Sequence, residues 1–208
     1  ASPNHDLDGN LLEDAQNRYT WNGENRLIQV ESKDTTTRVT YTYDYQGRRT
    51  TKQTFTRSKE TENFSLNTEN HYVYDGWNLL AQYSTNHQDP TSKIADTVRT
   101  YTWGRDLSGS LQGAGGVGGL LAISEGNAHR YPAYDANGNV GQLLDEGGHV
   151  TAAYVYDPFG NVTEMAGAEA AENPWRFSTK PVEEVNGWSY YGFRYYSQEI
   201  GRWLNRDP

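Results

Sequence analysis

The amino-acid sequence predicts an all-β protein built from successive antiparallel hairpins. Aromatic side chains are abundant, with 16 Tyr, 6 Trp and 5 Phe among 208 residues, and they can supply the core area that the scarce aliphatic residues do not. Aromatic residues together with many Thr favour pleated strands. A short motif, Tyr-x-Tyr-Asp-x-x-Gly, also recurs along the whole chain, which indicates a repeat architecture.

The motif occurs in seven versions at loose spacing, about one hairpin per step. In each version an Asp, or a residue that replaces it, marks the expected turn. The marks are Asp6, Asn22, Asp44, Asp75, Gly104, Asp135 and Asp157. Each copy therefore predicts a strand, a turn and a returning strand.

Each position of the motif has a structural reason. Two aromatic residues of one copy, such as Tyr41 and Tyr43, are two apart, so both rings stand on one face of a strand, which we expect to be the packed inner face. Asp at the first turn position and Gly at the fourth are typical of a type I turn, where the carboxylate caps backbone amides and Gly takes a positive φ. Gly47, Gly138 and Gly160 should therefore resist a Cβ.

The regions between the motif copies add little helix. Ala166 to Glu172 has helix-forming composition, but Asn173 and Pro174 follow, so we expect one or two turns at most. Residues 53–69 and 83–96 are polar and favour long loops or extended outer ends of hairpins. Because neighbouring hairpins pair edge to edge and large sheets twist, we expect a curved, single-layer β-shell.

Composition excludes several classes of protein. The longest strictly apolar run, Leu120 to Ile123, is too short to span a bilayer, and the absence of Cys excludes disulfide frameworks and thiolate metal sites. The net charge is −9, and residues 131–174 contain no Lys or Arg, so we do not expect nucleic acid as a partner. The first residue is Ala1 rather than Met, which suggests a processed or excised piece of something longer.

Two further patterns receive structural interpretations. Gly113, Gly115 and Gly118 satisfy the Gly-x-Gly-x-x-Gly expression, but the strand and helix that dinucleotide binding requires around it are missing. We interpret this segment as a loop and expect no cofactor. The histidines lack metal-ligand spacing, so we expect no metal site. They are His5, His71, His87, His129 and His149.

Four blocks in the second half of the chain are more specific than the single repeats. They are DLSGSLQGAGGVGGLLA at 106–122, YDPFGNV at 156–162, NPWRFSTK at 173–180 and SYYGFRYYSQEIGRWLNRDP at 189–208. Together with the Tyr-Asp repeats, they resemble the RHS or YD-repeat proteins, and in particular the RHS-associated core that closes the repeat array in bacterial members. The resemblance divides the chain into YD-repeat hairpins at 1–105 and a core region at 106–208, continuous with the same sheet.

The resemblance implies a large hollow β-shell that encloses a C-terminal polypeptide, usually a toxin, released after the core cleaves its own chain. The partners would be the remaining repeats and the cargo of the same polypeptide, and the location would be secreted or on the bacterial cell surface. Related cell-surface members use such shells in adhesion.

The resemblance also indicates Arg206 and Asp207 as candidate catalytic residues, because self-cleaving relatives carry an Arg-Asp-Pro element before the cut bond. A carboxylate pair sharing one proton could activate water or a backbone carbonyl, but the second carboxylate and the cut bond would lie beyond Pro208. We therefore expect neither self-cleavage nor hydrolase turnover from these residues alone. The alternative is an ordinary Asp-Pro turn with Arg206 as a surface or capping residue.

Three functional hypotheses follow from the sequence. The first is a structural shell segment that encloses a cargo polypeptide. The second is a cell-surface adhesion or carbohydrate-binding module, which needs exposed rather than stacked aromatic rings. The third is a self-cleaving aspartyl-type core that is incomplete in this chain.

Overall fold

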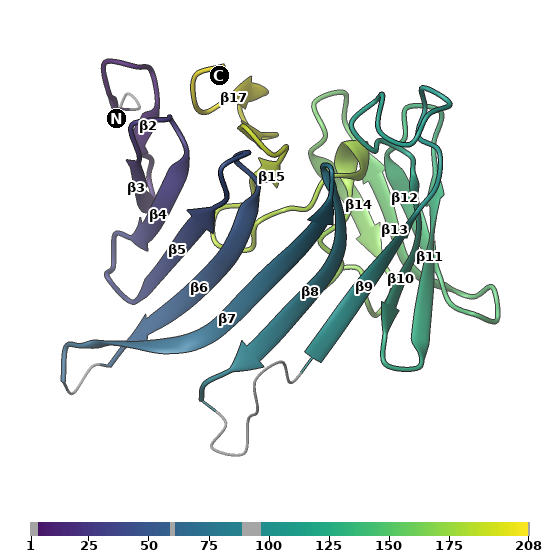
Figure 1. Ribbon diagram of the computed structural model, residues 1–208, viewed down its shortest axis with the longest axis horizontal. Coiled ribbons are helices and arrows are strands. Elements are labelled where there is room, and N and C mark those ends of the chain that lie inside the picture. Colours follow the sequence, from purple (N-terminus) through teal and green to yellow (C-terminus); the bar gives the residue numbers. More distant parts are fainter. Residues whose placement is uncertain (1–3, 59–60, 89–96, 208) are drawn as a thin grey trace.

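The computed structural model describes residues 4–58, 61–88 and 97–207, and its regular structure is almost entirely antiparallel β (Figure 1). In the described residues, 14 strands form one curved sheet, and three short strands form a second sheet. The strands of the large sheet are β1 (Asn4–His5), β2 (Leu11–Glu13), β3 (Asn17–Trp21), β4 (Leu27–Ser32), β5 (Thr37–Tyr43), β6 (Arg49–Arg57), β7 (Phe64–Asp75), β8 (Asn78–Asn86), β9 (Thr97–Trp103), β10 (Leu120–Glu125), β11 (Ala128–Tyr134), β12 (Val140–Leu144), β13 (Val150–Tyr156) and β14 (Val162–Ala166). The remaining elements are a 3-10 helix, η1 (Phe177–Thr179), and the strands β15 (Ser189–Tyr190), β16 (Tyr195–Ser197) and β17 (Arg202–Trp203).

The all-β prediction is confirmed, and the motif copies form hairpins. In the third hairpin, β5 and β6 pair antiparallel around a turn that begins at Asp44. The Oδ1 atom of Asp44 accepts hydrogen bonds from the backbone N–H groups of Gln46 and Arg48, both at 2.9 Å, and Gly47 has a φ of 85°. The other two predicted turn glycines also have positive φ: 74° at Gly138 and 90° at Gly160. The backbone thus requires glycine where the motif predicts it.

The aromatic residues of the motif face inward, as predicted. Tyr41 is buried, whereas Thr42, the next residue along β5, is exposed. Tyr43 donates its hydroxyl hydrogen bond to the backbone carbonyl of Leu27, in the preceding hairpin, at 2.6 Å. Equivalent bonds join Trp21 Nε1 to the Leu11 carbonyl, Trp103 Nε1 to Leu79, Tyr134 to Leu120 and Tyr156 to Val140, at 2.5 to 2.8 Å. Each of these aromatic residues connects its hairpin to the one before it.

Residues 167–207 form a C-terminal segment that covers the inner face of the curved sheet (Figure 1). Two cores lie between the sheet and this segment. The first is formed by Leu11, Tyr19, Leu27, Val30, Val39 and Tyr41 of the sheet with Trp188, Tyr190, Tyr195 and Leu204 of the segment. The second is formed by Leu79, Tyr101, Leu120, Ile123, Val140, Leu143, Ala152 and Tyr154 with Ala170 and Trp175. The segment therefore removes the aromatic face of the sheet, which forms the wall of the shell, from water.

The path of the chain differs from the sequence prediction after β14. The large sheet crosses the proposed domain boundary between residues 105 and 106, since β9 and β10 pair directly, and the boundary itself stays a prediction. Residues 106–208 do not all continue that sheet, because β15, β16 and β17 form their own. These strands are two or three residues long, and they bury Tyr190 and Tyr195 against the inner face instead of extending the edge.

The fifth turn begins two residues later than the motif predicts. Asp106, not Gly104, makes the turn contacts: its carbonyl accepts a hydrogen bond from Gly109 N at 2.9 Å, and its Oδ1 accepts one from Ser108 N at 3.0 Å. The motif places the first turn residue directly after the aromatic pair, which predicts Gly104. The Asp-x-x-Gly sequence that forms the turn, however, begins at Asp106.

Three other segments can be compared with their predictions. Strand β6 extends to Arg57 and β7 begins at Phe64, so most of 53–69 forms the extended outer ends of a hairpin. In the second polar region, β8 extends to Asn86, and residues 89–96 lie outside the described residues. The segment after β14 forms turns rather than helix, with one helix-like hydrogen bond from Asn173 N to the Glu169 carbonyl at 3.0 Å.

In the described part of the chain, no helix has the length and apolar character needed to cross a membrane.

Gly160→Ala should destabilise the protein by about 1 kcal/mol or more. A side chain at this φ is strained, and a Cβ would lie 2.5 Å from Cγ of Phe177. Urea unfolding of both proteins measures the difference. Gly23→Ala is the matched control, because a Cβ there meets no atom within 4 Å and its φ is not left-handed. Unchanged stability in Gly160→Ala would contradict the turn assignment.

Candidate functional site

The C-terminal segment docks on the wall mainly through pairs of aromatic rings. Ring centroids lie 4.4 Å apart for Tyr19 and Trp188, 6.4 Å for Tyr41 and Tyr195, 5.3 Å for Tyr101 and Trp175, and 5.9 Å for Tyr156 and Phe177. In each pair the first ring belongs to a repeat motif and the second to the segment. Tilted and edge-to-face pairs of this kind stabilise a core beyond the area that they bury.

A buried ion cluster, Arg49, Lys52 and Glu183, joins β6 to the segment between the two aromatic cores. Arg49 Nη1 is paired with Oε1 of Glu183, and Lys52 Nζ lies 2.9 Å from Oε2. The Glu183 side chain is only 2% exposed, and those of Arg49 and Lys52 are 5% and 14% exposed. The hydroxyl of Tyr190 accepts a hydrogen bond from Arg49 N at 3.1 Å. These contacts fix the segment to the middle of the wall.

The charges of the cluster stabilise one another. Burial alone would raise the pKa of the Glu183 carboxyl, but Arg49 and Lys52 outweigh burial and lower that pKa to about 2. Burial opposes the charge of Arg49 as well, yet Glu183 holds the pKa of that guanidinium well above its usual value. All three groups therefore remain charged across the ordinary pH range.

A second connection joins η1 to two turns of the wall. The Thr179 hydroxyl accepts a hydrogen bond from Gly118 N at 2.7 Å and donates one to the Gly138 carbonyl at 2.8 Å. Ser178 N donates to Oδ1 of Asn139 at 2.8 Å. Gly118 belongs to the glycine-rich 113–118 stretch, which lies in the loop between β9 and β10. Its backbone N–H binds the protein itself, in agreement with the structural interpretation of that motif.

Between the wall and the segment lies a cavity of about 510 Å³, lined by β6 to β9 on one side and by residues near η1 and β15 on the other. Part of its wall side is polar. Asn70 Oδ1 accepts hydrogen bonds from Gln82 Nε2 at 2.9 Å and from the Ser84 hydroxyl at 2.6 Å, and the Tyr101 hydroxyl donates to Gln82 at 3.3 Å. The cavity borders both aromatic cores, through Tyr190 of the first and Leu79, Tyr101 and Trp175 of the second.

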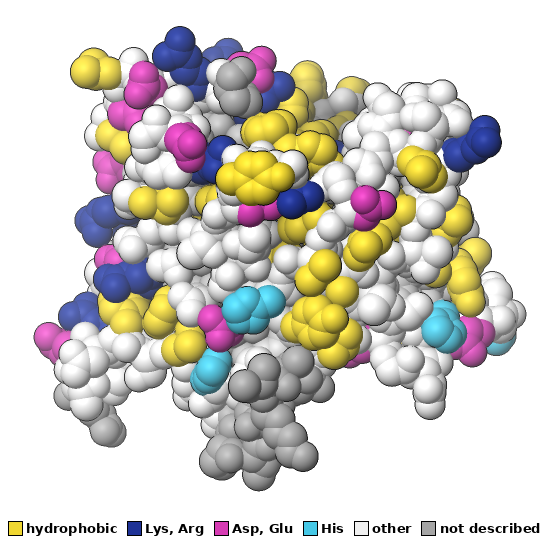
Figure 2. Space-filling model, in the orientation of Figure 1, with side chains coloured by type: hydrophobic (Ala, Val, Ile, Leu, Met, Phe, Trp, Pro, Cys, Tyr) yellow, Lys and Arg dark blue, Asp and Glu magenta, His cyan; other side chains and the backbone are white. Residues whose placement is uncertain are grey.

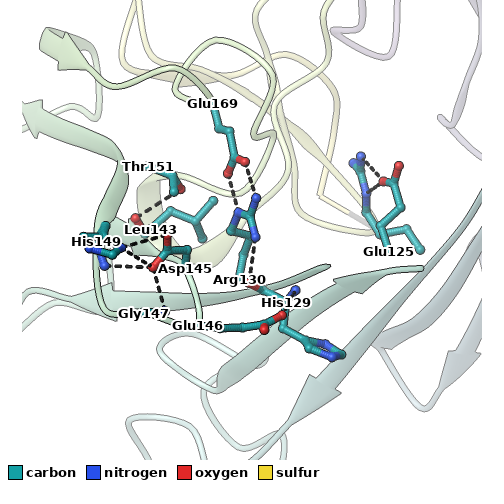
Figure 3. A network of polar contacts seen from close by, with 11 residues as sticks. Glu125, His129, Arg130, Leu143, Asp145, Glu146, Gly147, His149, Thr151 and Glu169 are labelled. Carbon is teal, nitrogen blue, oxygen red and sulfur yellow. Dashed lines mark hydrogen bonds and ion pairs between the residues drawn. The ribbon is translucent and has the colours of Figure 1, made fainter. Parts of the chain in front are cut away.

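Figure 3 shows a polar network at the opposite end of the segment from its terminus. Arg130 of β11 holds Glu169 through two hydrogen bonds, Nε to Oε2 at 2.6 Å and Nη2 to Oε1 at 2.5 Å. A similar pair, Arg99 and Glu125, joins β9 to β10, with Nη2 to Oε2 at 2.6 Å. Asp145 and His149 form the turn contacts nearby. The Arg130–Glu169 pair fixes the start of the segment to the sheet.

The predicted catalytic residues lie at the exposed end of the segment. Asp207, whose side chain is 75% exposed, lies beside the Arg194 guanidinium, with Oδ2 and Nη1 3.5 Å apart. Arg206 turns toward Asp8 on the first hairpin, with Nη1 and Oδ1 3.5 Å apart. The two neighbours in sequence therefore contact different partners, and their catalytic role stays a prediction.

Asn205, the residue before them, is held by several hydrogen bonds, and it was not among the residues that the sequence analysis singled out. Asn205 is buried; its Oδ1 accepts a hydrogen bond from Tyr195 N at 3.1 Å, and its Nδ2 donates to the carbonyls of Asn25 and Phe193, both at 3.1 Å. Leu204, also buried, accepts a hydrogen bond from Leu11 N at 3.0 Å. The segment thus reaches the rim of the shell beside the first hairpins, and Figure 1 shows both termini near that rim.

The histidines do not assemble into a metal centre. His71 and His87 lie near one carboxylate, Glu69, with Nε2 to Oε2 distances of 3.6 and 3.7 Å. Figure 2 shows histidine side chains at the surface, spread over one face of the molecule. Over the described ranges, no group of three or more His, Cys, Asp or Glu side chains is arranged to hold a metal ion.

No family model matches the chain. Its sequence, however, is similar to the WapA nucleases of Bacillus. It is 30% identical over 209 residues both to the tRNA3(Ser)-specific nuclease WapA of Bacillus spizizenii and to the tRNA nuclease WapA of Bacillus subtilis. These alignments cover 100% of this chain but 8% of each WapA protein. The double-stranded DNA deaminase toxin A of Burkholderia cenocepacia is 27% identical over 207 residues, covering 92% of this chain and 14% of that toxin.

Solved structures with the same fold come from toxin assemblies. The crystal structure of TcdB2-TccC3-TEV superposes with a TM-score of 0.74 at 23% identity, covering 98% of this chain and 10% of that one. The Photorhabdus luminescens Tc holotoxin pore gives a TM-score of 0.69 at 20% identity and similar coverage. The chain therefore has the fold of one segment of these β-shells, and it spans about a tenth of the length of the proteins that it matches.

Glu183→Gln should destabilise the protein by about 3–5 kcal/mol, because two buried cations lose their anion. The wild-type carboxyl has a lowered pKa, so its stabilising effect is present above the unfolded-state pKa of about 4.3 and is lost as the pH falls toward 2. Chemical unfolding between pH 7 and pH 2.5 should show this loss in the wild type and a flatter profile in Glu183→Gln.

Glu24→Gln is the control for this measurement. Its carboxylate also pairs with an arginine, Arg26, at 3.2 Å, but the Glu24 side chain is 67% exposed, so the change should be within about 1 kcal/mol. If Glu183→Gln were no more destabilised than Glu24→Gln, the buried cluster would contribute no more to stability than an exposed ion pair does.

Proposed function

We propose that this chain is the closing part of the hollow β-shell of an RHS or YD-repeat protein, and that the shell encloses a C-terminal cargo polypeptide, typically a toxin. One observation carries the proposal: the chain's own C-terminal segment covers the inner face of a curved, 14-stranded wall. The segment then reaches the rim through Leu204 and Asn205. In the proposed shell, such a wall, continued by the other repeats, would enclose space, and the segment would close one end of it.

The comparisons support this proposal. WapA and the deaminase toxin are many times longer than this chain, and their names describe enzymatic activities. The same stretch of about 200 residues in proteins named for different activities is what we expect of a common shell that carries different cargos. We infer a bacterial protein that is secreted or located at the cell surface, with the remaining repeats and the cargo as its partners.

The carbohydrate-binding alternative has less support. A sugar platform needs exposed aromatic faces, but the motif residues Tyr19, Tyr41, Tyr101 and Tyr154 are each at most 6% exposed and pack against the segment or its neighbours. The regularity of the motif aromatics is thus explained by packing. A glycan-binding assay with the isolated chain should accordingly give no specific signal.

The enclosure of cargo can be tested by limited proteolysis of the full natural polypeptide. The cargo region should resist a broad-specificity protease in the intact protein and be digested at protease concentrations at least about tenfold lower when the same region is expressed alone. Cargo fragments are identified by mass spectrometry. Equal digestion in the two settings would argue against an enclosing shell.

Self-processing is a separate proposal, and it rests on Asp207. In the full natural polypeptide, Asp207→Asn should abolish cleavage after the core, because the amide cannot transfer the proton. Intact mass detects the product. Glu24→Gln is again the control, since Glu24 is also an exposed carboxylate, and it pairs with Arg26 rather than with Arg206 or Arg194. Normal cleavage in Asp207→Asn would defeat the catalytic assignment while leaving the shell proposal intact.

A further inference from the structure

The inner face of the wall is repetitive, so aromatic contacts alone do not determine where the C-terminal segment docks. Five of the hairpins offer the segment nearly the same pair of rings. These pairs are Tyr19 and Trp21, Tyr41 and Tyr43, Tyr72 and Tyr74, Tyr101 and Trp103, and Tyr154 and Tyr156. From the second to the fifth hairpin, a shift by one hairpin, or about 10 Å, would replace one pair by the next.

Arg49 interrupts this repetition. It lies near the start of the returning strand in the third hairpin, paired across the ladder with Tyr43, and the other hairpins have an aliphatic residue at the equivalent paired position. Those residues are Leu11, Leu27, Leu79, Leu120, Val140 and Val162. Arg49 is buried like an aliphatic residue, at 4% exposure, the same as Leu11. Its guanidinium carbon lies 5.2, 5.0 and 4.4 Å from the ring centroids of Tyr41, Tyr72 and Tyr190, so wall and segment rings both surround the charge.

Glu183 is the complementary group on the segment. In the observed position its two carboxylate oxygens are paired separately, Oε1 with Arg49 and Oε2 with Lys52. After a shift by one hairpin in either direction, Glu183 would face Leu27 or Leu79. Its buried charge would then have no cation, and Arg49 would be left buried without an anion.

We propose that Arg49 and Lys52 select the docking position of the C-terminal segment. They pair with Glu183 at the third hairpin, whereas an aliphatic residue at the same place in the other hairpins would leave the buried carboxylate without a cation. A single buried polar contact sets the register of repetitive helical packings in the same way. The proposal concerns docking only and does not depend on whether the shell encloses cargo.

Disulfide trapping tests this directly, because the chain contains no Cys. Trp77 and Phe193 are in contact at the rim, with ring centroids 4.4 Å apart, and both are partly exposed, so Trp77→Cys/Phe193→Cys reports the observed position. Tyr45, 89% exposed, occupies the turn of the preceding hairpin. Tyr45→Cys/Phe193→Cys therefore reports a shift by one hairpin.

With the native cluster, the 77–193 disulfide should form and the 45–193 disulfide should be rare. In an Arg49→Leu/Lys52→Leu/Glu183→Leu background, the ratio of the two should fall by about tenfold or more, the factor that corresponds to about 1.4 kcal/mol between docking positions. Removing an ion pair outside the cluster, Arg38→Leu/Glu31→Leu, should leave the ratio unchanged. An unchanged ratio in the triple-Leu background would overturn the proposal.

A charge exchange covers the case in which the triple-Leu protein fails to fold. Glu183→Arg alone should lose the 77–193 disulfide, whereas Arg49→Glu/Glu183→Arg should recover it, since the opposite charges again meet at one hairpin. Recovery supports selection by charge. Failure of the double exchange to recover the native disulfide, in a protein whose circular dichroism is that of the wild type, would overturn it.

Discussion

The wall depends on one hydrogen bond that recurs in five of its seven hairpins. The ladder between β4 and β5 starts at Gln29, so the carbonyl of Leu27 lies outside it, and the hydroxyl of Tyr43 supplies the missing donor. The ladder between β12 and β13 likewise starts at Gln142, and Tyr156 binds the carbonyl of Val140. A buried carbonyl without a partner is costly. Tyr or Trp is therefore needed before the turn, because Phe would bury a similar ring but has no donor.

Most of the wall could be predicted from sequence because its determinants are local. A pair of aromatic residues two apart sets the buried face, and Asp-x-x-Gly sets the turn, so Tyr41 to Gly47 contains nearly all the information for its hairpin. The prediction for the fifth turn is wrong by two residues because its aromatic pair and its turn residues are separated by an insertion of that length. The short strands β15 to β17 have too few residues for any periodicity, and their position depends on tertiary contacts with the wall.

The site was less predictable for the same reason. Arg206 and Asp207 could be named because they form a contiguous motif, but their partners, Asp8 and Arg194, are set by the fold. Glu183 gave no local signal, since its cations, Arg49 and Lys52, lie far earlier in the sequence. A signal did exist at Arg49, where an alignment of the repeats shows a cation in an otherwise aliphatic column.

The division of contacts between wall and segment has a consequence for the order of folding. Every strand of the large sheet pairs with its neighbour in sequence, so hairpins can form one after another as the chain emerges from the ribosome, each closing a short loop. Until the wall is complete, the aromatic face of these hairpins is exposed to water. The residues that cover it, such as Trp175, Trp188 and Tyr195, are synthesised after all 14 strands. A newly made wall thus exposes an aromatic face that can aggregate. This face becomes protected only when the C-terminal segment has been synthesised and has docked on it.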